Sequence, residues 1–147
     1  MKGNGLARRK LVLVSPKAQE KAPCPCGTGA SYRRCCAPYL AGEREAPTAE
    51  ALMRARYSAN ARGDVVFLTR SWHPDTLPTH LIDPTVVWTG LEVRATDGGR
   101  ALDRVATVTF LARYRRGAHH GVLSERSRFQ RMGTRWVYVD GEVDPSL

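Results

Sequence analysis

The four cysteines of this 147-residue chain all lie between positions 24 and 36, as Cys24, Cys26, Cys35 and Cys36. Four thiolates so close together suit a tetrahedral zinc ion, which holds sulfur ligands at about 2.3 Å. Pro25 fixes the backbone between the first two cysteines. The adjacent pair can reach one metal only in a turn or at a helix start, because a strand would send the two side chains to opposite faces. Four thiolates leave no coordination position for water, so the predicted site is structural.

Three other uses of these cysteines remain open. A pair of disulfides needs an oxidising compartment, whereas the apolar run at residues 11–14 is too short for a secretory signal. Redox exchange usually employs C-x-x-C, whereas the first pair here is C-x-C. The third alternative is that the thiols are simply buried. We predict one structural zinc ion per chain and a cytoplasmic protein.

The cysteine segment carries the pattern C-P-C-G-T-G-x-x-Y-x-x-C-C over residues 24–36. This pattern resembles the SEC-C zinc motif, known from the C-terminal tail of the SecA translocation ATPase. Ala30 stands where a basic residue is more usual. The resemblance implies a protein partner, and we expect Tyr32, Arg33 and Arg34 to form the surface that meets it.

The net charge of +9 is concentrated towards the N-terminus, where all the lysines precede Cys24. We predict four segments: a flexible basic tail over 1–22, a zinc module over 23–40, a linker over 41–47 and an α+β domain over 48–147. The basic N-terminal part makes RNA or ribosome-associated binding one further hypothesis. Apolar runs fall well short of the roughly 20 residues that a membrane-spanning helix needs.

Two amphipathic helices are predicted after the linker. The first begins at the N-cap Thr48 and ends at Gly63. Its predicted apolar face consists of Ala49, Leu52, Met53, Tyr57 and Ala61. Arg54, Ser58 and Arg62 fall elsewhere on the helix. The second helix begins after Asp64 and ends before Pro74, with Val65, Leu68 and Trp72 as its buried stripe.

Strand signals occupy the rest of the chain. Segments rich in β-branched and aromatic residues, some alternating with polar ones, predict strands over 86–95, 106–114, 122–132 and 135–143. Glycine-containing turns at 97–99, 116–121 and 133–134 separate them, which places His119 and His120 in an exposed loop. Helices followed by a meander of strands predict an α+β fold, in which two helices pack on a curved antiparallel sheet.

Three further segments widen the resemblance: residues 52–59, 71–76 and 136–142 are similar to the YchJ family. That family joins a SEC-C motif to a cone-shaped, cystatin-like roll of the nuclear-transport-factor-two-like (SnoaL-like) superfamily. Asn60 and Leu77 depart from the family pattern, where an aromatic residue and an arginine are usual. The family has no established activity, so the resemblance implies architecture rather than function.

The last hairpin predicts a cavity. If Phe129 pairs with Tyr138 across the turn at Gly133, Ser127 faces Asp140 and Arg131 faces Trp136 on one side of the sheet. In a cone fold that side closes against the first helix. The predicted lining residues are Tyr57, Trp72, Phe110, Tyr114, Ser127, Phe129 and Trp136.

The same cavity offers candidates for acid–base chemistry. Glu125 or Asp140 is the candidate general base, and His73 or Tyr138 is its candidate partner. A structural alternative pairs Glu125 with Arg56 in an ion pair and makes His73 a cap of the second helix. We therefore carry two main hypotheses. The first is a protein-binding adaptor, which could also form a homodimer through the sheet. The second is a small-molecule-binding protein or enzyme that uses the cavity.

Overall fold

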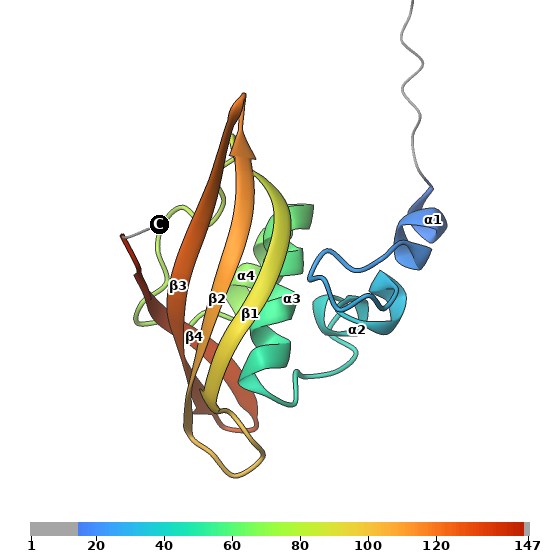
Figure 1. Cartoon of the computed structure of the whole chain (residues 1–147). Coiled ribbons are helices and arrows are strands. Elements are labelled where there is room, and N and C mark those ends of the chain that lie inside the picture. Colours follow the sequence, from blue (N-terminus) through green and yellow to red (C-terminus); the bar gives the residue numbers. More distant parts are fainter. Residues whose placement is uncertain (1–14, 146–147) are drawn as a thin grey trace, which may run out of the picture.

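The computed structural model describes residues 15–145, and it confirms the predicted α+β fold (Figure 1). A short N-terminal region with little regular structure precedes two helices and a four-stranded antiparallel sheet. Its elements are helix α1 (Pro16–Lys21), the 3-10 turn η1 (Tyr32–Arg34) and helix α2 (Ala37–Leu40). The two helices that follow are α3 (Ala49–Arg62) and α4 (Val65–Arg70). The strands are β1 (Val87–Gly98), β2 (Val105–Arg116), β3 (His119–Met132) and β4 (Arg135–Val143), in the spatial order β1-β2-β3-β4.

Helix α3 begins and ends as the sequence predicts, but it is buried on more than one side. The Thr48 side chain accepts a hydrogen bond from the Ala51 amide at 3.1 Å, and Gly63 ends the helix in the left-handed conformation. The predicted face was wrong at its end, since Ala61 is exposed. Ser58, predicted to lie off that face, is fully buried. The reason is that α3 lies between the sheet and the cysteine segment, which leaves it little free surface (Figure 1).

Helix α4 is shorter than predicted. Asp64 caps it by accepting a hydrogen bond from the Phe67 amide at 2.9 Å. Phe67 and Leu68 are its buried residues, whereas Val65 is 49% exposed, so the predicted stripe was wrong at Val65. The helix ends at Arg70, and Trp72 instead makes an isolated parallel bridge to β4.

Three strands are longer than their sequence signals suggest, and β2 exceeds its predicted range of 106–114 at both ends. Strand β1 extends into the predicted turn at 97–99, because Asp97 pairs with Thr107 and Gly98 pairs with Ala106. The chain therefore reverses over residues 99–104. Strand β3 already begins at His119, so His119 and His120 lie at the exposed start of a strand rather than in a loop.

The register of the last hairpin differs from the predicted one at a single point. Phe129 pairs with Tyr138, as predicted. A bulge at Val139 then shifts the register, so that Ser127 pairs with Gly141 and not with Asp140. One extra residue reverses the face to which the following side chains point. The prediction that Asp140 shares a face with Ser127 was therefore wrong.

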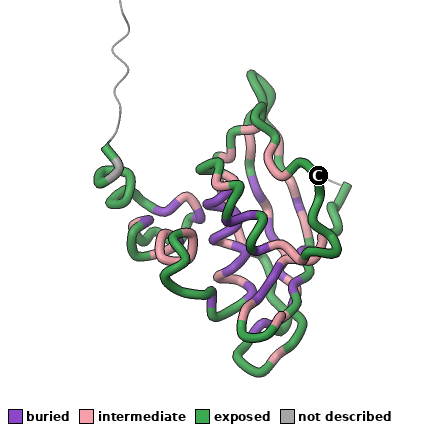
Figure 2. The backbone as a smooth tube through the Cα atoms, turned by 180° about the vertical axis from the view of Figure 1, so that it is seen from behind, coloured by how far each residue is buried: buried purple, intermediate pink, exposed green. Residues whose placement is uncertain are grey.

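The cysteine segment shares its core with the rest of the protein. Cys24, Cys26, Tyr32 and Cys36 belong to the same cluster of buried residues as Leu52 and the inner face of the sheet. Figure 2 shows this continuity, with buried positions running from the cysteine segment through α3 into the strands. The predicted tail over 1–22 lies partly outside the described residues, and its last part contains α1.

The segment predicted as a linker contacts its surroundings. Ala46 is buried, and just before the segment the Tyr39 carbonyl accepts a hydrogen bond from the Arg70 guanidinium at 2.8 Å. Within residues 15–145, none of the helices is long and apolar enough to cross a membrane.

Candidate metal centre and ligand cavity

The four cysteine sulfurs lie within 4.8 Å of one another. Cys26 and Cys35 approach to 3.5 Å, and Cys35 and Cys36 to 4.0 Å. Sulfur ligands of a tetrahedral zinc ion are separated by roughly 3.7 Å, since each metal–sulfur bond is about 2.3 Å long. All four cysteines are free thiols. Cys35 is partly exposed, and the other three are buried. The donor set and its spacing therefore fit a metal ion.

Local backbone structure brings the two pairs together. The Cys24 amide donates to the Ala30 carbonyl at 2.8 Å, which closes the loop that carries the first pair. Cys35 and Cys36 lie between the 3-10 turn and α2, as the geometry of adjacent ligands requires. Gly27 adopts a left-handed φ of 82°, and a Cβ there would lie 3.3 Å from the Leu91 carbonyl oxygen. The loop thus packs closely against β1.

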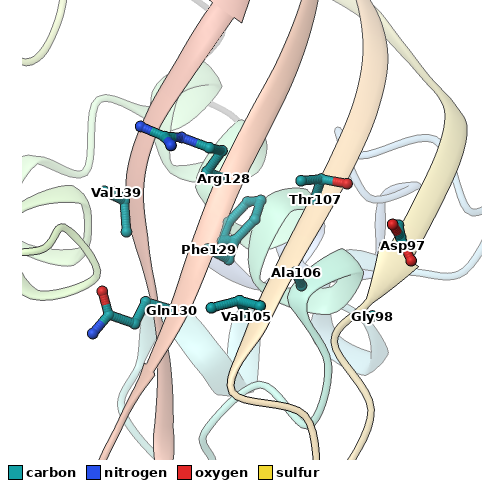
Figure 3. Close-up of a pocket in the computed structure, with 9 residues that line it drawn as sticks. All are labelled: Asp97, Gly98, Val105, Ala106, Thr107, Arg128, Phe129, Gln130 and Val139. Atoms are coloured by element: carbon teal, nitrogen blue, oxygen red, sulfur yellow. The ribbon is translucent and has the colours of Figure 1, made fainter.

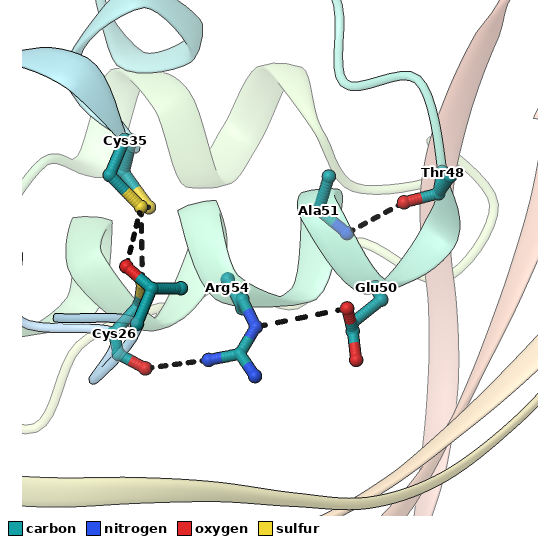
Figure 4. Close-up of polar contacts among 8 residues, drawn as sticks. Cys26, Cys35, Thr48, Glu50, Ala51 and Arg54 are labelled. Atoms are coloured by element: carbon teal, nitrogen blue, oxygen red, sulfur yellow. Dashed lines mark hydrogen bonds and ion pairs between the residues drawn. The ribbon is translucent and has the colours of Figure 1, made fainter. Parts of the chain in front are cut away.

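Helix α3 supplies three polar side chains to the cysteine segment from positions four residues apart. The hydroxyl of Ser58 lies 3.4 Å from Cys24 Sγ. Arg54 Nη1 donates to the Cys26 carbonyl at 2.8 Å, while its Nε lies 3.9 Å from Glu50 (Figure 4). The Arg62 guanidinium sits 4.1 Å above the ring of Tyr32. The sequence did not predict these contacts, because all three residues were placed off the buried face of the helix. Their spacing of four residues was the one pattern that indicated a second contact face.

The thiols influence each other's protonation. Hydrogen bonds from Cys26 and Cys36 lower the pKa of Cys24, whereas burial raises the pKa of Cys35 to about 11. Thr28 places its hydroxyl 3.2 Å from Cys35 Sγ and 3.8 Å from Cys26 Sγ. Four thiolates in so small a volume repel one another, and a bound dication is the usual means of keeping them deprotonated.

A second candidate site is a cavity of about 190 Å³ between α3 and the inner face of the sheet. Of the residues predicted to line it, Tyr57, Trp72, Phe110, Ser127 and Phe129 do so. The remaining lining residues are Met53, Arg56, Asn60, Leu81, Trp88, Ala112, Leu123, Glu125 and Tyr138. The walls are mainly apolar, with a small group of polar side chains at one end, which is the usual composition of a small-molecule site.

Arg56 is the buried cation of this cavity, with only 7% of its surface exposed. Its guanidinium lies 4.6 Å from the Trp72 ring centroid and 4.4 Å from that of Tyr138. Nη1 donates to the Leu68 carbonyl at 3.1 Å and to the Ser71 hydroxyl at 2.7 Å. Burial lowers the pKa of Arg56 to about 10, and the nearby Tyr138 and Glu125 oppose that shift. At neutral pH the side chain remains charged.

Glu125 supplies the carboxylate on the inner face of the sheet, where it lines the cavity. Its Oε1 accepts hydrogen bonds from the Tyr138 hydroxyl at 2.8 Å and from the Ser127 hydroxyl at 2.9 Å. The carboxylate lies over Gly141, where a Cβ would overlap it. Burial raises the pKa of Tyr138, and the Glu125 charge adds to that effect, so this phenol remains a neutral donor. Among the described ion pairs there is none between Glu125 and Arg56, and the structural pair considered from the sequence is replaced by these hydrogen bonds.

Four predicted residues lie outside the cavity lining. Asp140 is on the opposite face of the sheet, where it pairs with Arg128 and where that guanidinium lowers its pKa. His73 accepts a hydrogen bond at Nδ1 from the Asp75 amide. Tyr114 packs over Gly121 and behind the cavity residue Trp88, with ring centroids 5.9 Å apart. Trp136 is buried beneath the Arg131 guanidinium, which lies 4.5 Å from its ring.

The opposite face of the sheet carries a broader hollow of about 410 Å³, drawn in Figure 3. Thr107, Arg128 and Gln130 lie along it, with Val105 and Val139 as apolar contacts. Arg128 is already engaged by Asp140, and among the described residues the lining contains no cluster of metal-ligating side chains. This hollow offers little chemistry.

The fold and the two sites define a class: a cone-shaped α+β domain with a four-cysteine centre docked on its first long helix. Comparisons identify the family. The profile of the middle, NTF2-like domain of YchJ matches residues 48–141, and the profile of the SEC-C motif matches residues 21–38. The chain belongs to the YchJ family, whose members also carry the name UPF0225.

Relatives and solved structures agree with this assignment. A UPF0225 protein of Streptomyces coelicolor is 52% identical over 121 residues, which are 82% of this chain and 94% of the relative. One from Deinococcus radiodurans is 46% identical, over 80% of this chain and 87% of the relative. The solution structure of a SEC-C motif containing protein from Rhodopseudomonas palustris superposes with a TM-score of 0.72 at 32% identity, covering 82% of this chain and 98% of the other. A crystal structure of a SEC-C motif containing protein from Psychrobacter arcticus gives 0.68 at 27% identity, covering 88% and 86%.

Proposed function

We propose that this protein is a cytoplasmic, zinc-stabilised adaptor that binds an acidic protein segment through its N-terminal region. The observation that carries the proposal is a hollow of about 420 Å³ between α1 and the 3-10 turn, bordered by Lys17, Lys21 and Arg33 with Glu20 as the one acid. All four of these side chains are exposed. A concave surface with three cations attracts carboxylates and steers an acidic partner towards it.

The position of Tyr32 modifies the surface expected from the sequence. Its ring is 6% exposed and covered by Arg62, so it belongs to the core. Arg33 and Arg34 are exposed, and the same short turn that buries Tyr32 holds them outward. The proposed contact surface therefore consists of Arg33, Arg34 and the lysines of α1.

Zinc has a supporting role in this proposal. Four thiol donors in a closed cluster favour zinc over harder cations, and they leave no position at which water could be activated. A metal there holds the two ends of residues 24–36 together and thereby fixes the turn that carries Arg33. Four free thiols in close contact also support a reducing compartment, hence the cytoplasm.

Affinity capture with the full-length, zinc-loaded chain tests the adaptor proposal. The test variant carries Lys17→Glu, Lys21→Glu and Arg33→Glu. The control carries the same charge change at the exposed positions Arg104, Arg115 and Arg126, away from the hollow. We expect an acidic protein to be captured by the wild type and the control and lost from the test variant, with zinc content unchanged in all three. Partners retained by the test variant, or capture of RNA in place of protein, would contradict the proposal.

A further inference from the structure

We propose that the cavity between α3 and the sheet binds a small, uncharged ring compound that carries a hydrogen-bond acceptor beside a donor, as in a carboxamide or a lactam. The inference rests on polar atoms of the cavity that have no partner in the protein, on the opposed charges of Arg56 and Glu125, and on the size of the cavity. It is independent of the proposed adaptor surface, which lies on the far side of α3.

Two donor atoms of the Arg56 guanidinium lack partners in the described part of the protein. Both hydrogen bonds of Arg56 use Nη1, so within the described residues Nε and Nη2 of its guanidinium make none. Arg56 lines the cavity, and these two atoms remain accessible, whereas the indole Nε1 of Trp72 is sealed by the surrounding protein. The two hydrogen bonds of Nη1 fix the guanidinium, so its free donors are held in place at a mainly apolar cavity, as in sites that orient a ligand acceptor.

One acceptor is also free. Both hydrogen bonds to Glu125 reach Oε1, from Tyr138 and Ser127, and within the described residues Oε2 receives none. The two hydroxyl donors fix the carboxylate, and Gly141 provides the space beneath it. A ligand that offers one acceptor to Arg56 and one donor to Glu125 would engage both groups.

The charges disfavour an ionic ligand. A carboxylate ligand would be attracted by Arg56 but repelled by Glu125. An ammonium ligand would be attracted by Glu125 but repelled by Arg56. Both interactions are strong in a partly buried cavity. Two aromatic rings at the polar end of the cavity already hold a cation. The guanidinium of Arg56 already stacks against Trp72 and Tyr138. A neutral ligand avoids both conflicts.

The volume of the cavity limits the size of the ligand. Pockets for drug-sized molecules measure roughly 300–1,000 Å³, so a cavity of about 190 Å³ admits a single ring with one substituent. Its apolar walls are Met53, Leu81, Phe110, Leu123 and Phe129. These side chains surround a ring, while the polar end takes the amide.

Four probes of one shape test the inference: benzamide, benzoate, benzylamine and toluene. Binding to the full-length zinc-loaded protein is followed by tryptophan fluorescence, because Trp72 and Trp88 line the cavity, and by ligand-observed NMR. We expect benzamide to bind at least about tenfold more tightly than the other three, which is the effect of one good buried hydrogen bond. Toluene binding as tightly as benzamide, or none of the four binding at millimolar concentration, would overturn the inference.

Two variants connect the probe result to the named groups. Glu125→Gln keeps the shape and removes the negative charge, so benzoate should gain about tenfold and overtake toluene. Leu123→Phe narrows the cavity at a half-buried wall position and should abolish binding of every probe. Unchanged melting temperatures identify both variants as folded. Benzamide binding that is unaffected by both substitutions would place the ligand elsewhere and contradict the inference.

Discussion

The Ser58 hydroxyl lies 3.4 Å from Cys24 Sγ, and this contact joins the first long helix to the cysteine cluster. Ser58 is fully buried, so its hydroxyl has little choice of partner. Arg54 and Arg62 extend the same contact line in both directions along α3. The opposite side of the helix lines the cavity through Met53 and Tyr57. One helix therefore supports both sites.

Ser58→Ala should weaken metal binding. Removing a hydrogen bond to a metal-bound thiolate typically costs 10–100-fold in affinity, because the bond offsets part of the ligand's negative charge. Competition with a chromophoric chelator measures the zinc affinity directly. Thr69→Ala is the matched control, since it also deletes a hydroxyl from a helix but at an exposed site bonded to the Val65 carbonyl. Equal zinc affinity in wild type and Ser58→Ala would show that the contact does not support the metal.

Cys36→Ser should release zinc and destabilise the whole chain. Cys36 is 1% exposed and belongs to the same core as α3, so loss of the metal loosens the helix as well as the loop. We expect metal analysis to fall from one zinc per chain to none and calorimetry to show one transition at lower temperature. Two separate transitions, with the upper one unchanged from the wild type, would mean that the cysteine segment folds independently.

Gly141→Ala should destabilise the sheet. A Cβ at this position would overlap the Glu125 carboxylate, which must then leave Tyr138 and Ser127. Overpacking of this kind costs about 1–3 kcal/mol in free energy of unfolding, as urea denaturation would measure. Gly90→Ala is the control, because a Cβ there meets only Arg113 at 4.0 Å. Equal losses in both variants would exclude the Glu125 contact as the cause.

Stability should fall in alkaline solution partly through Tyr138. Burial raises the pKa of this phenol above its ordinary value near 10. The folded state therefore keeps a proton that the unfolded state loses, and the stabilisation is complete below pH 10 and is lost as pH rises towards the folded pKa. The melting temperature of Tyr138→Phe should therefore fall less steeply than that of the wild type between pH 9.5 and 11. This range brackets the pKa of about 10 that tyrosine has in the unfolded chain. A steeper or identical loss in the variant would contradict this assignment. Tyr32 and Tyr57, whose pKa values burial also raises, contribute in the same direction.

The predictable features were those with local causes. Thr48 and Gly63 mark the ends of α3 because caps act on neighbouring backbone groups. The cysteine spacing predicts a metal site without reference to the rest of the chain. The burial of Ser58 was not predictable in this way, because it depends on a segment that is remote in sequence and covers a second side of the helix. The bulge at Val139 has no distinct local signal, and it alone moved Asp140 to the opposite face.

Trp72 shows the same limit. Its spacing from Leu68 suits a helix, but the chain leaves the helix at Ser71, whose carbonyl accepts from the Tyr138 amide at 2.8 Å. That pairing with β4 brings Trp72 against Tyr138, with ring centroids 4.8 Å apart. The residue still reaches the predicted cavity, by a route that only the tertiary structure reveals.

X-ray absorption at the zinc edge, on the full-length chain purified without added metal, tests the central claim most directly. If Cys24, Cys26, Cys35 and Cys36 hold one structural zinc ion, the spectrum contains four sulfur ligands at about 2.3 Å and no oxygen or nitrogen ligand. A shell that includes oxygen or nitrogen, or a protein that contains another metal or none, would contradict it.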